Sequence, residues 1–495
     1  MTDRFLGLAG RLVMAAPAGR SLLVKEEAIL RRGGVGHLIL FRRNMRDQEE
    51  VGRLTARAAR LLPRPPLIAT DQEGGLVSEA RAVAGVPPAP MRLGAAGDEG
   101  AAEAWARESA ARLREIGVGM ALAPVLDVVG PGGGAVIGTR AYGGRPGLVA
   151  RMGAAAVRGA LLGGVLPVGK HFPGHGGVRA DSHTGLPADR RTGDLIRRRD
   201  LVPFHAAIRA GLPAVMIAHV AYPGLGTGRR PATLSEEVIG GLLRRQLGFR
   251  GIVMSDALEM AGFPGMEGVV PAFRAGIDLF CAGRSLAQGE RVAGLLARAM
   301  REGRIDPEEA GERGERIERL RDGLPAASSP PRRRPPFPEA RGIVRARGRG
   351  PFRPFPAEGG ILFLPKRLEG RIGLPVDPGE AVRGAGAVRV VRYPFDPSPG
   401  EVRVLLREAG RVPASAVGIL GRGEPPAGQL RLLRGLAPLP GRLLPVALLD
   451  PEPLLRAWPG EALLTFGFEP EALVALLRVL SGKSRPAGTS PLAIR

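Results

Sequence analysis

The sequence predicts an α/β protein in which a (β/α)8 TIM-like barrel precedes a smaller three-layer α/β sandwich domain. Between residues 35 and 283, short apolar runs alternate with longer stretches of helical period, which is typical of repeated β-α units. Ionisable side chains close many of the apolar runs, where barrel enzymes gather their catalytic groups. The 495 residues also exceed what one hydrophobic core usually organises, so a second domain is expected.

The barrel strands are expected at seven apolar runs that contain small or β-branched residues. In chain order these runs are 35–41, 67–71, 118–127, 166–171, 214–219, 251–256 and 277–280. Helices are expected between them, near residues 48–61, 99–115, 147–162, 197–210 and 234–247. Ser235 can cap the first turn of the last of these helices. An eighth strand is not placed, so an incomplete or irregular barrel stays open.

Ionisable residues at the ends of the expected strands favour a barrel over an open sheet. An open doubly wound sheet usually concentrates its ligands at one switch point, whereas these residues are spread over five strands. They are Asp71, Asp127, Lys170, His171, His219 and Asp256.

A stretch rich in proline and arginine separates the two expected domains. A helix near 306–321 precedes it, and the composition of 325–340 is typical of a semi-extended linker. Beyond it, five short apolar runs are expected to form the strands of the second domain: 361–364, 388–391, 417–420, 443–449 and 463–466. The predicted domains are therefore residues 1–324 and residues 341–495.

The composition argues against several classes of function. The net charge of +23 is carried almost wholly by arginines that are scattered along the chain, and aromatic residues make up only 4%, so nucleic-acid binding is not expected. No apolar run reaches the length of a membrane-spanning helix, and the N-terminus lacks the apolar core of a signal peptide, so a cytoplasmic protein is expected. The single cysteine, Cys281, excludes a disulfide within the chain.

The densest group of candidate catalytic residues lies in the segment from Lys170 to His183, which holds three of the six histidines. Its glycines let the backbone turn sharply, so the segment is expected to be a loop that can close over a ligand. Within it, Asp181 can orient the ring of His183. A carboxylate that binds one imidazole nitrogen fixes the tautomer and leaves the other nitrogen free for proton transfer.

Three further positions can contribute to the same site. Asp256 ends an apolar strand and is followed by a small residue, which suits a nucleophile. Asp71 also ends its strand, beside Glu73 and a Gly-Gly turn. Arg140 offers a planar set of donors for hydroxyl or carbonyl groups.

Each of these residues also has an ordinary structural explanation when taken alone. A strand-end aspartate is more often a cap or turn former, and isolated lysines and arginines are mostly solvated surface charges. His37 and His205 are given no role, and a structural role is equally open for His219. A zinc site from His171, His175, Asp181 and His183 is disfavoured because Pro173 and Gly174 interrupt the helix that such spacing needs, and no metal or other cofactor is expected.

Six segments, taken together, resemble glycoside hydrolase family 3, and in particular its bacterial β-N-acetylhexosaminidase branch. They are Asp71–Gly75, Leu122–Val128, Ile137–Arg140, Lys170–Gly176, Asp181–His183 and Val253–Asp256, in the family's order. The resemblance covers nearly the whole chain, although in the second domain it is carried only by 446–451 and the C-terminal 488–494.

The resemblance implies a retaining glycosidase without a cofactor. Asp256 would attack the anomeric carbon, His183 would act as acid and base, and Asp181 would orient His183. Asp71, Arg140, Lys170 and His171 would bind the sugar hydroxyls. The substrate would be a small carbohydrate with a terminal β-linked N-acetylglucosamine, and cytoplasmic members of this branch act on muropeptides in peptidoglycan recycling.

The chain departs from the family pattern in one segment. The family often carries arginines directly after Gly75 and three residues later, where this chain has Leu76 and Glu79, and Arg81 is a candidate replacement. Three alternatives therefore stay open: a β-glucosidase, a glycoside phosphorylase, and a carbohydrate-binding protein without turnover. A neutral histidine tolerates an incoming phosphate better than a carboxylate would.

Overall fold

The computed structural model describes two compact units. The described residues are 3–130, 136–178, 185–324, 334–337, 339–367, 388–421 and 424–492. The first unit combines Met1–Pro87, Glu99–Val128 and Val149–Pro335, and the second combines Pro88–Asp98, Val129–Leu148 and Pro336–Arg495. Among the described residues, no helix is both long and apolar enough to cross a membrane.

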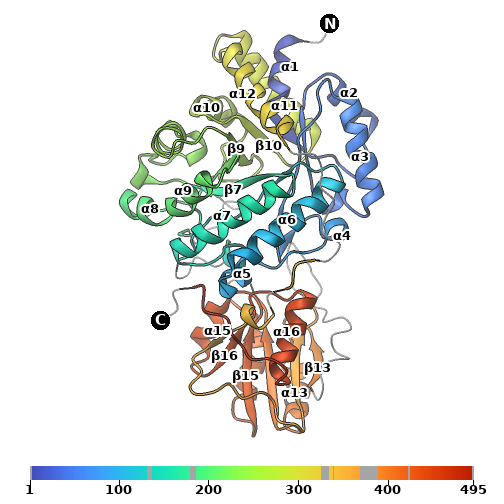
Figure 1. Ribbon diagram of the computed structural model, residues 1–495, viewed down its shortest axis with the longest axis vertical. Helices are drawn as coiled ribbons and strands as arrows, with labels where there is room; N and C mark the ends of the chain where they lie inside the picture. The colour runs from blue at the N-terminus through green and yellow to red at the C-terminus, as the bar shows by residue number, and fades with distance from the viewer. Residues whose placement is uncertain are drawn as a thin grey trace. The chain divides into compact units, whose positions relative to one another are not determined.

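The first unit is built around a closed barrel of parallel strands, and it is drawn in blue to yellow in Figure 1. The strands follow one another around the barrel in the order β1-β10-β9-β8-β7-β6-β3-β2. Their bounds are β1 Val13–Ala15, β2 His37–Leu40, β3 Ile68–Thr70, β6 Met120–Ala121, β7 Leu166–Phe172, β8 Ala214–Ile217, β9 Ile252–Ala257 and β10 Leu279–Ala282. All seven predicted strand regions are represented, and the predicted barrel fold is confirmed.

The eighth strand is β1, which the sequence did not reveal. It is only three residues long and pairs with both β10 and β2, which closes the barrel. A strand this short that is buried on every side shows no alternation of apolar and polar residues, and the run that contains it continues into Pro17.

Helices cover the outside of the barrel, and several begin at a side-chain cap. The Asp47, Thr192, Ser285 and Asp306 side chains each accept a hydrogen bond from the first turn of a helix. The helices are α1 Arg4–Gly10, α2 Val24–Arg31, α3 Gln48–Leu61, α4 Arg81–Ala84, α6 Glu99–Glu115, α7 Pro146–Leu162, α8 Gly193–Arg199, α9 Leu201–Arg209, α10 Val269–Ala275, α11 Leu286–Arg301 and α12 Pro307–Asp322.

Two helix predictions need refinement. The helix expected near 197–210 is divided into α8 and α9, which meet at Asp200. The helix expected near 234–247 is a π-helix, η5 (Glu237–Gln246), and the Ser235 hydroxyl accepts a hydrogen bond from the N–H of Val238 at 3.3 Å, as predicted.

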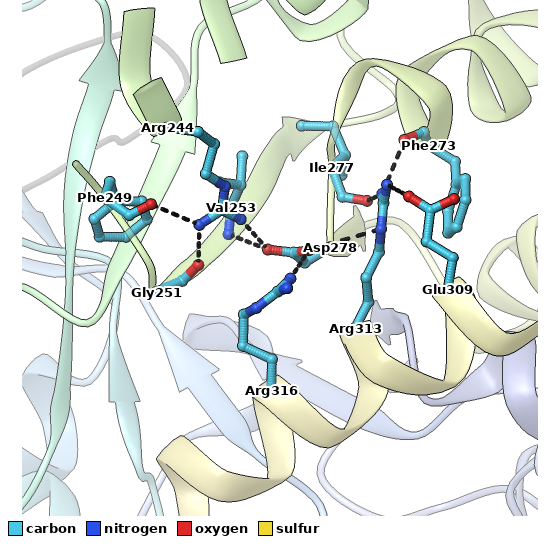
Figure 2. A network of polar contacts seen from close by, with 10 residues as sticks. All are labelled: Arg244, Phe249, Gly251, Val253, Phe273, Ile277, Asp278, Glu309, Arg313 and Arg316. Atoms are coloured by element: carbon cyan, nitrogen blue, oxygen red, sulfur yellow. Dashed lines mark hydrogen bonds and ion pairs between the residues drawn. The ribbon is translucent and has the colours of Figure 1, made fainter. Parts of the chain in front are cut away.

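A buried carboxylate fastens α12 and η5 to the amino-terminal end of the barrel (Figure 2). Asp278 is 1% exposed, and its carboxylate lies 2.7 Å from Arg244 of η5 and 2.5 Å from Arg316 of α12. It also accepts a hydrogen bond from the backbone N–H of Val253 at the start of β9. Arg313 of α12 donates to the carbonyl oxygens of Phe273 and Ile277, so the arginines here are engaged in holding the scaffold.

The second unit contains a six-stranded sheet with the order β11-β16-β15-β14-β12-β13. The strands are β11 Val344–Ala346, β12 Gly360–Pro365, β13 Val388–Tyr393, β14 Ala414–Ile419, β15 Arg442–Ala447 and β16 Ala462–Leu464, accompanied by helices α13 Pro399–Ala409, α14 Ala427–Leu436, α15 Pro451–Ala457 and α16 Pro470–Leu480. The five predicted strands are present, and β11 adds an antiparallel edge strand that was not predicted. The predicted second α/β domain is confirmed.

The second unit also takes in two segments that precede the linker in sequence. Helix α5 (Pro90–Ala96) carries Arg92, which is fully buried and donates to the carbonyl oxygens of Thr465 at 2.9 Å and Glu339 at 3.0 Å. The segment 136–148 is joined to the C-terminal tail, where Gly144 N–H donates to the carbonyl oxygen of Pro491 at 2.9 Å. The domain boundaries predicted from the sequence, which place one domain at 1–324 and the other at 341–495, stay a prediction.

Candidate active site

Lys170 lies at the centre of a charged cluster at the carboxyl end of β7. Its Nζ donates to Oδ1 of Asp71 at 2.6 Å and lies 2.5 Å from Oε1 of Glu73. The Lys170 side chain is 2% exposed and that of Glu73 is fully buried, whereas Asp71 keeps 22% of its side chain exposed. Two carboxylates around one buried ammonium satisfy its charge, and the exposed part of Asp71 can still bind a ligand.

Asp127 organises the backbone and the side chain of the neighbouring segment. Its Oδ2 lies 2.7 Å from Nδ1 of His171, and its Oδ1 accepts the backbone N–H groups of His171 at 3.2 Å and His175 at 2.7 Å. Burial alone would raise the pKa of Asp127, but its interactions with His171 and His175 outweigh burial and hold the pKa below its usual value. An ionised Asp127 therefore fixes Nδ1 of His171 as a donor and leaves Nε2 for other partners.

Asp256 is the penultimate residue of β9 and is held as an anion. Its Oδ1 accepts the backbone N–H of Ala257 at 2.8 Å. Burial would raise the pKa of Asp256, but interactions with His171, His219 and Lys170, together with the Ala257 hydrogen bond, lower it below the usual value. A partly buried carboxylate that stays ionised beside basic residues has the properties that a nucleophile requires.

His219 follows β8 and is fully buried next to the strand that carries Asp256. Ile217 pairs with Ser255 in the β8–β9 register, so the chain positions that follow these two residues run alongside each other. The Nδ1 atom of His219 lies 2.7 Å from the hydroxyl of Thr233, and the ring packs against Phe263. Burial lowers the pKa of His219, while Asp256 opposes that effect, so these two residues interact electrostatically.

The predicted pair Asp181 and His183 lies outside the described residues. On the amino-terminal side of that stretch, the carbonyl oxygen of Gly174 accepts a hydrogen bond from the Tyr222 hydroxyl at 3.1 Å. On the other side, Arg191 lies 2.6 Å from Asp189 and 3.0 Å from Asp200. The chain is therefore anchored on both sides of the predicted acid/base pair.

Arg140 lies in the second unit rather than in the barrel unit. It ends a short 3-10 turn, η2 (Gly138–Arg140), and its guanidinium donates to the carbonyl oxygen of Val136 at 3.4 Å. The structure therefore brings together Asp71, Lys170, His171 and Asp256 within the barrel unit, whereas Arg140 belongs to the second unit.

Leu76 and Glu79, which depart from the family pattern, lie in and directly after the hairpin of β4 (Gln72–Gly74) and β5 (Val77–Ser78). Arg81 donates to the carbonyl oxygens of Ser78 and Leu76, both at 3.1 Å. Glu79 instead accepts the backbone N–H of Arg42, at 2.7 Å, from the loop that follows β2. Arg81 therefore stabilises the hairpin. The guanidinium of Arg42 lies 3.5 Å from the carboxylate of Glu79, so a guanidinium is still present beside this position.

Sequence reasoning gave too little weight to Glu73, Asp127 and His175. Glu73 follows Asp71 by two residues, and this spacing on an extended chain places both side chains on one side, which was the available signal. His175 contacts Asp127 through its backbone N–H, and a pattern of side chains cannot predict such a contact. Among the described residues, no three His, Cys, Asp or Glu side chains converge as metal ligands, and Cys281 is a buried free thiol whose pKa burial raises well above its usual value.

Comparison with known proteins gives the family. The sequence profile described as "Glycosyl hydrolase family 3 N terminal domain" matches residues 13–320. The chain belongs to glycosyl hydrolase family 3. Among family relatives, the beta-hexosaminidase of Thiobacillus denitrificans is 42% identical over 277 residues, which covers 54% of this chain and 76% of the relative. The beta-hexosaminidase of Neisseria meningitidis is 39% identical over 280 residues, with the same coverage.

Solved structures extend the family likeness into the second domain. A glycoside hydrolase family 3 beta-N-acetylglucosaminidase from Paenibacillus has a TM-score of 0.89 and 31% identity, with 98% of both chains covered. NagZ from Neisseria gonorrhoeae, in complex with N-trifluoroacetyl-D-glucosamine, has a TM-score of 0.54 and 35% identity and covers 62% of this chain. A family 3 assignment and the glycosidase class, both predicted from the sequence, are confirmed.

Proposed function

We propose that this family 3 enzyme removes terminal β-linked N-acetylglucosamine with retention of configuration. The observation that carries the proposal is the anionic Asp256 at the end of β9, beside the Lys170 and His171 cluster at the same end of the barrel. A full-length likeness to a beta-N-acetylglucosaminidase supports the choice of sugar.

In the first step, the Asp256 carboxylate attacks the anomeric carbon while the bond to the leaving oxygen breaks. The leaving oxygen takes a proton from His183, which Asp181 orients. Asp256 loses its negative charge when the glycosyl ester forms, so its carboxylate must be ionised and correctly positioned before the substrate reacts. The low pKa of Asp256 and its hydrogen bond from Ala257 N–H support this role.

In the second step, His183 takes a proton from water, and the water oxygen attacks the same carbon. The ester bond to Asp256 breaks, the carboxylate returns, and the product keeps the β configuration. Asp71, Lys170, His171 and Arg140 bind sugar hydroxyls during both steps. For Asp71 this role is supported by the exposed part of its carboxylate, and for His171 by the ring orientation that Asp127 fixes at Nδ1.

The natural substrates on this proposal are muropeptide fragments of peptidoglycan, processed in the cytoplasm. Support comes from the named hexosaminidase relatives. No cofactor takes part in either step.

The test is a screen of chromogenic β-glycosides with wild type, Asp256→Ala and His183→Ala. Turnover of the N-acetylglucosaminide by wild type, its loss in Asp256→Ala, and labelling of Asp256 by a fluorinated glycosyl donor are the expected results. Full activity of Asp256→Ala on the N-acetylglucosaminide would overturn the mechanism. A rate that depends on added phosphate would instead indicate phosphorolysis, and binding without cleavage would indicate a carbohydrate-binding protein.

A further inference from the structure

Arg191 is held by two buried carboxylates. Its guanidinium donates to both carboxylate oxygens of Asp189, from Nε at 2.9 Å and 3.0 Å and from Nη2 at 2.6 Å. Its Nη1 lies 3.0 Å from Oδ2 of Asp200. Asp189 is 2% exposed and Asp200 is fully buried. A planar guanidinium that meets two carboxylates in this way is fixed in orientation as well as in position.

The same guanidinium lies against the chain on the other side of residues 179–184. A Cβ atom on Gly177 would lie 2.3 Å from both Cζ and Nη2 of Arg191, so nothing separates the guanidinium from this glycine. Asp200 takes a similar place beside Gly174, where a Cβ atom would lie 2.6 Å from the Cβ of Asp200. Arg191 and Asp200 therefore connect the chain up to Gly177 with the chain from Asp189 onwards.

The chain on both sides of this stretch is also attached to the segment that follows β8. On the carboxyl side, Asp189 N–H donates to the carbonyl oxygen of Ala221 at 2.8 Å, and Ala221 N–H donates to that of Pro187 at 2.9 Å. On the amino side, the Tyr222 hydroxyl donates to the carbonyl oxygen of Gly174 at 3.1 Å. Because β8 lies between β7 and β9 in the barrel, these anchors are fixed relative to the strand that carries the nucleophile.

We propose that Arg191 is a positioning residue that sets where the acid/base His183 stands relative to Asp256. This inference rests on the proposed roles of both residues, and His183 itself lies outside the described residues. A retaining glycosidase needs its acid/base group at a short, fixed separation from the nucleophile, on the other side of the glycosidic bond. With the chain on either side joined at Arg191, the segment that carries His183 begins and ends at fixed points beside the nucleophile's strand.

The dependence of the rate on the leaving group tests this role. kcat/KM reports formation of the glycosyl ester, in which a phenyl aglycone needs the proton from His183 and a dinitrophenyl aglycone leaves without it. In Arg191→Met, kcat/KM is expected to fall by about 100-fold for the phenyl N-acetylglucosaminide, the cost of a misplaced catalytic group, and by much less for the dinitrophenyl one. Equal losses for the two substrates would overturn the proposal.

His183→Ala gives the reference pattern, because it removes the proton donor itself. A larger loss for the phenyl than for the dinitrophenyl substrate is expected there too. Equal losses in His183→Ala would show that the proposed acid/base role is wrong. A selective loss in His183→Ala without one in Arg191→Met would show instead that the acid/base role stands and that Arg191 does not position it.

Two further variants keep the result interpretable if Arg191→Met folds poorly. Arg191→Lys keeps a positive charge between Asp189 and Asp200 but removes the planar fork, so the same selective loss with a smaller size is expected. Where only Arg191→Lys folds, a wild-type ratio of the two kcat/KM values in it overturns the proposal.

Arg244→Met is the matched control. The Arg244 side chain is 18% exposed, against 20% for Arg191, and it pairs with the buried Asp278 at the amino-terminal end of the barrel. Arg244→Met is expected to lose stability and to keep the wild-type ratio of the two kcat/KM values. The same selective loss in Arg244→Met would count against a role for Arg191.

The second step offers an independent measurement. With the dinitrophenyl substrate, hydrolysis of the ester is expected to limit kcat of Arg191→Met, because this step needs His183 as a base. Azide attacks the anomeric carbon without a base, which forms a glycosyl azide and releases the Asp256 carboxylate, so added azide is expected to raise kcat. No increase in Arg191→Met under conditions where azide raises kcat of His183→Ala would overturn the proposal.

Discussion

The Nζ atom of Lys170 lies 2.6 Å from Oδ1 of Asp71, and the ammonium is buried while the carboxylate is partly exposed. This ion pair joins β7 to the loop after β3, two strands that are separated by β6 in the barrel. It gives the site a polar face that is already ordered in the free protein, so little reorganisation is needed when a sugar binds.

Asp71→Asn is expected to raise KM by roughly tenfold or more, the cost of losing a hydrogen bond to a charged group. Stability should change little because Lys170 keeps Glu73 as its buried partner, 2.5 Å away. Steady-state kinetics with the N-acetylglucosaminide and urea unfolding measure the two effects. Glu49→Gln, at an exposed pair on α3, is the control and should change neither.

Asp127→Asn is expected to lower kcat/KM by roughly 100-fold, because it removes the charge that orients His171 and the backbone of His175. The amide can still accept hydrogen bonds at Oδ1, so the variant should fold. A lower kcat/KM with a native circular dichroism spectrum is the expected combination, and unchanged kinetics would show that His171 needs no such support.

The free energy of unfolding is expected to fall below neutral pH because His37 is buried as a neutral ring. Burial lowers the pKa of His37 from 6.5 to about 4, so the folded protein holds a neutral ring where the unfolded chain would be protonated. The stabilisation is fully present above pH 6.5 and falls as the pH drops towards 4, by about 3 kcal/mol in total. The stability advantage of wild type over His37→Leu should therefore shrink between pH 7 and pH 4.5, and a constant difference would contradict this account.

Asp278→Asn is expected to destabilise the barrel by about 3–5 kcal/mol, since it leaves the guanidinium groups of Arg244 and Arg316 without their buried anion (Figure 2). Thermal unfolding measures the loss. Asp322→Asn, which removes an exposed partner of Arg321, should leave the unfolding temperature unchanged. Because Asp278 lies at the amino-terminal ends of the strands, KM should not change in either variant.

The sequence was most informative where one local signal coincides with the tertiary role of a residue. Asp71, Lys170 and Asp256 end apolar runs, and strand ends on one side of a barrel converge whatever the helices between them contain. The β1 strand was missed because three buried residues carry no periodicity. The Nδ1 atom of His219 lies 2.7 Å from the hydroxyl of Thr233, fourteen residues away, and such pairings arise only from the folded register of the chain.

The three-part composition of the second unit bears on how the protein is made. Its three segments, residues 88–98, 129–148 and 336–495, are synthesised at different times. The hydrogen bond from Thr489 N–H to the carbonyl oxygen of Ala95 joins the last segment to the first. Arg92 has neither of its carbonyl acceptors until Glu339 is synthesised, and it has both only after Thr465. A gene cut at the linker would therefore leave the C-terminal fragment without residues 88–98 and 129–148 of its own unit, so the two fragments would have to be expressed together.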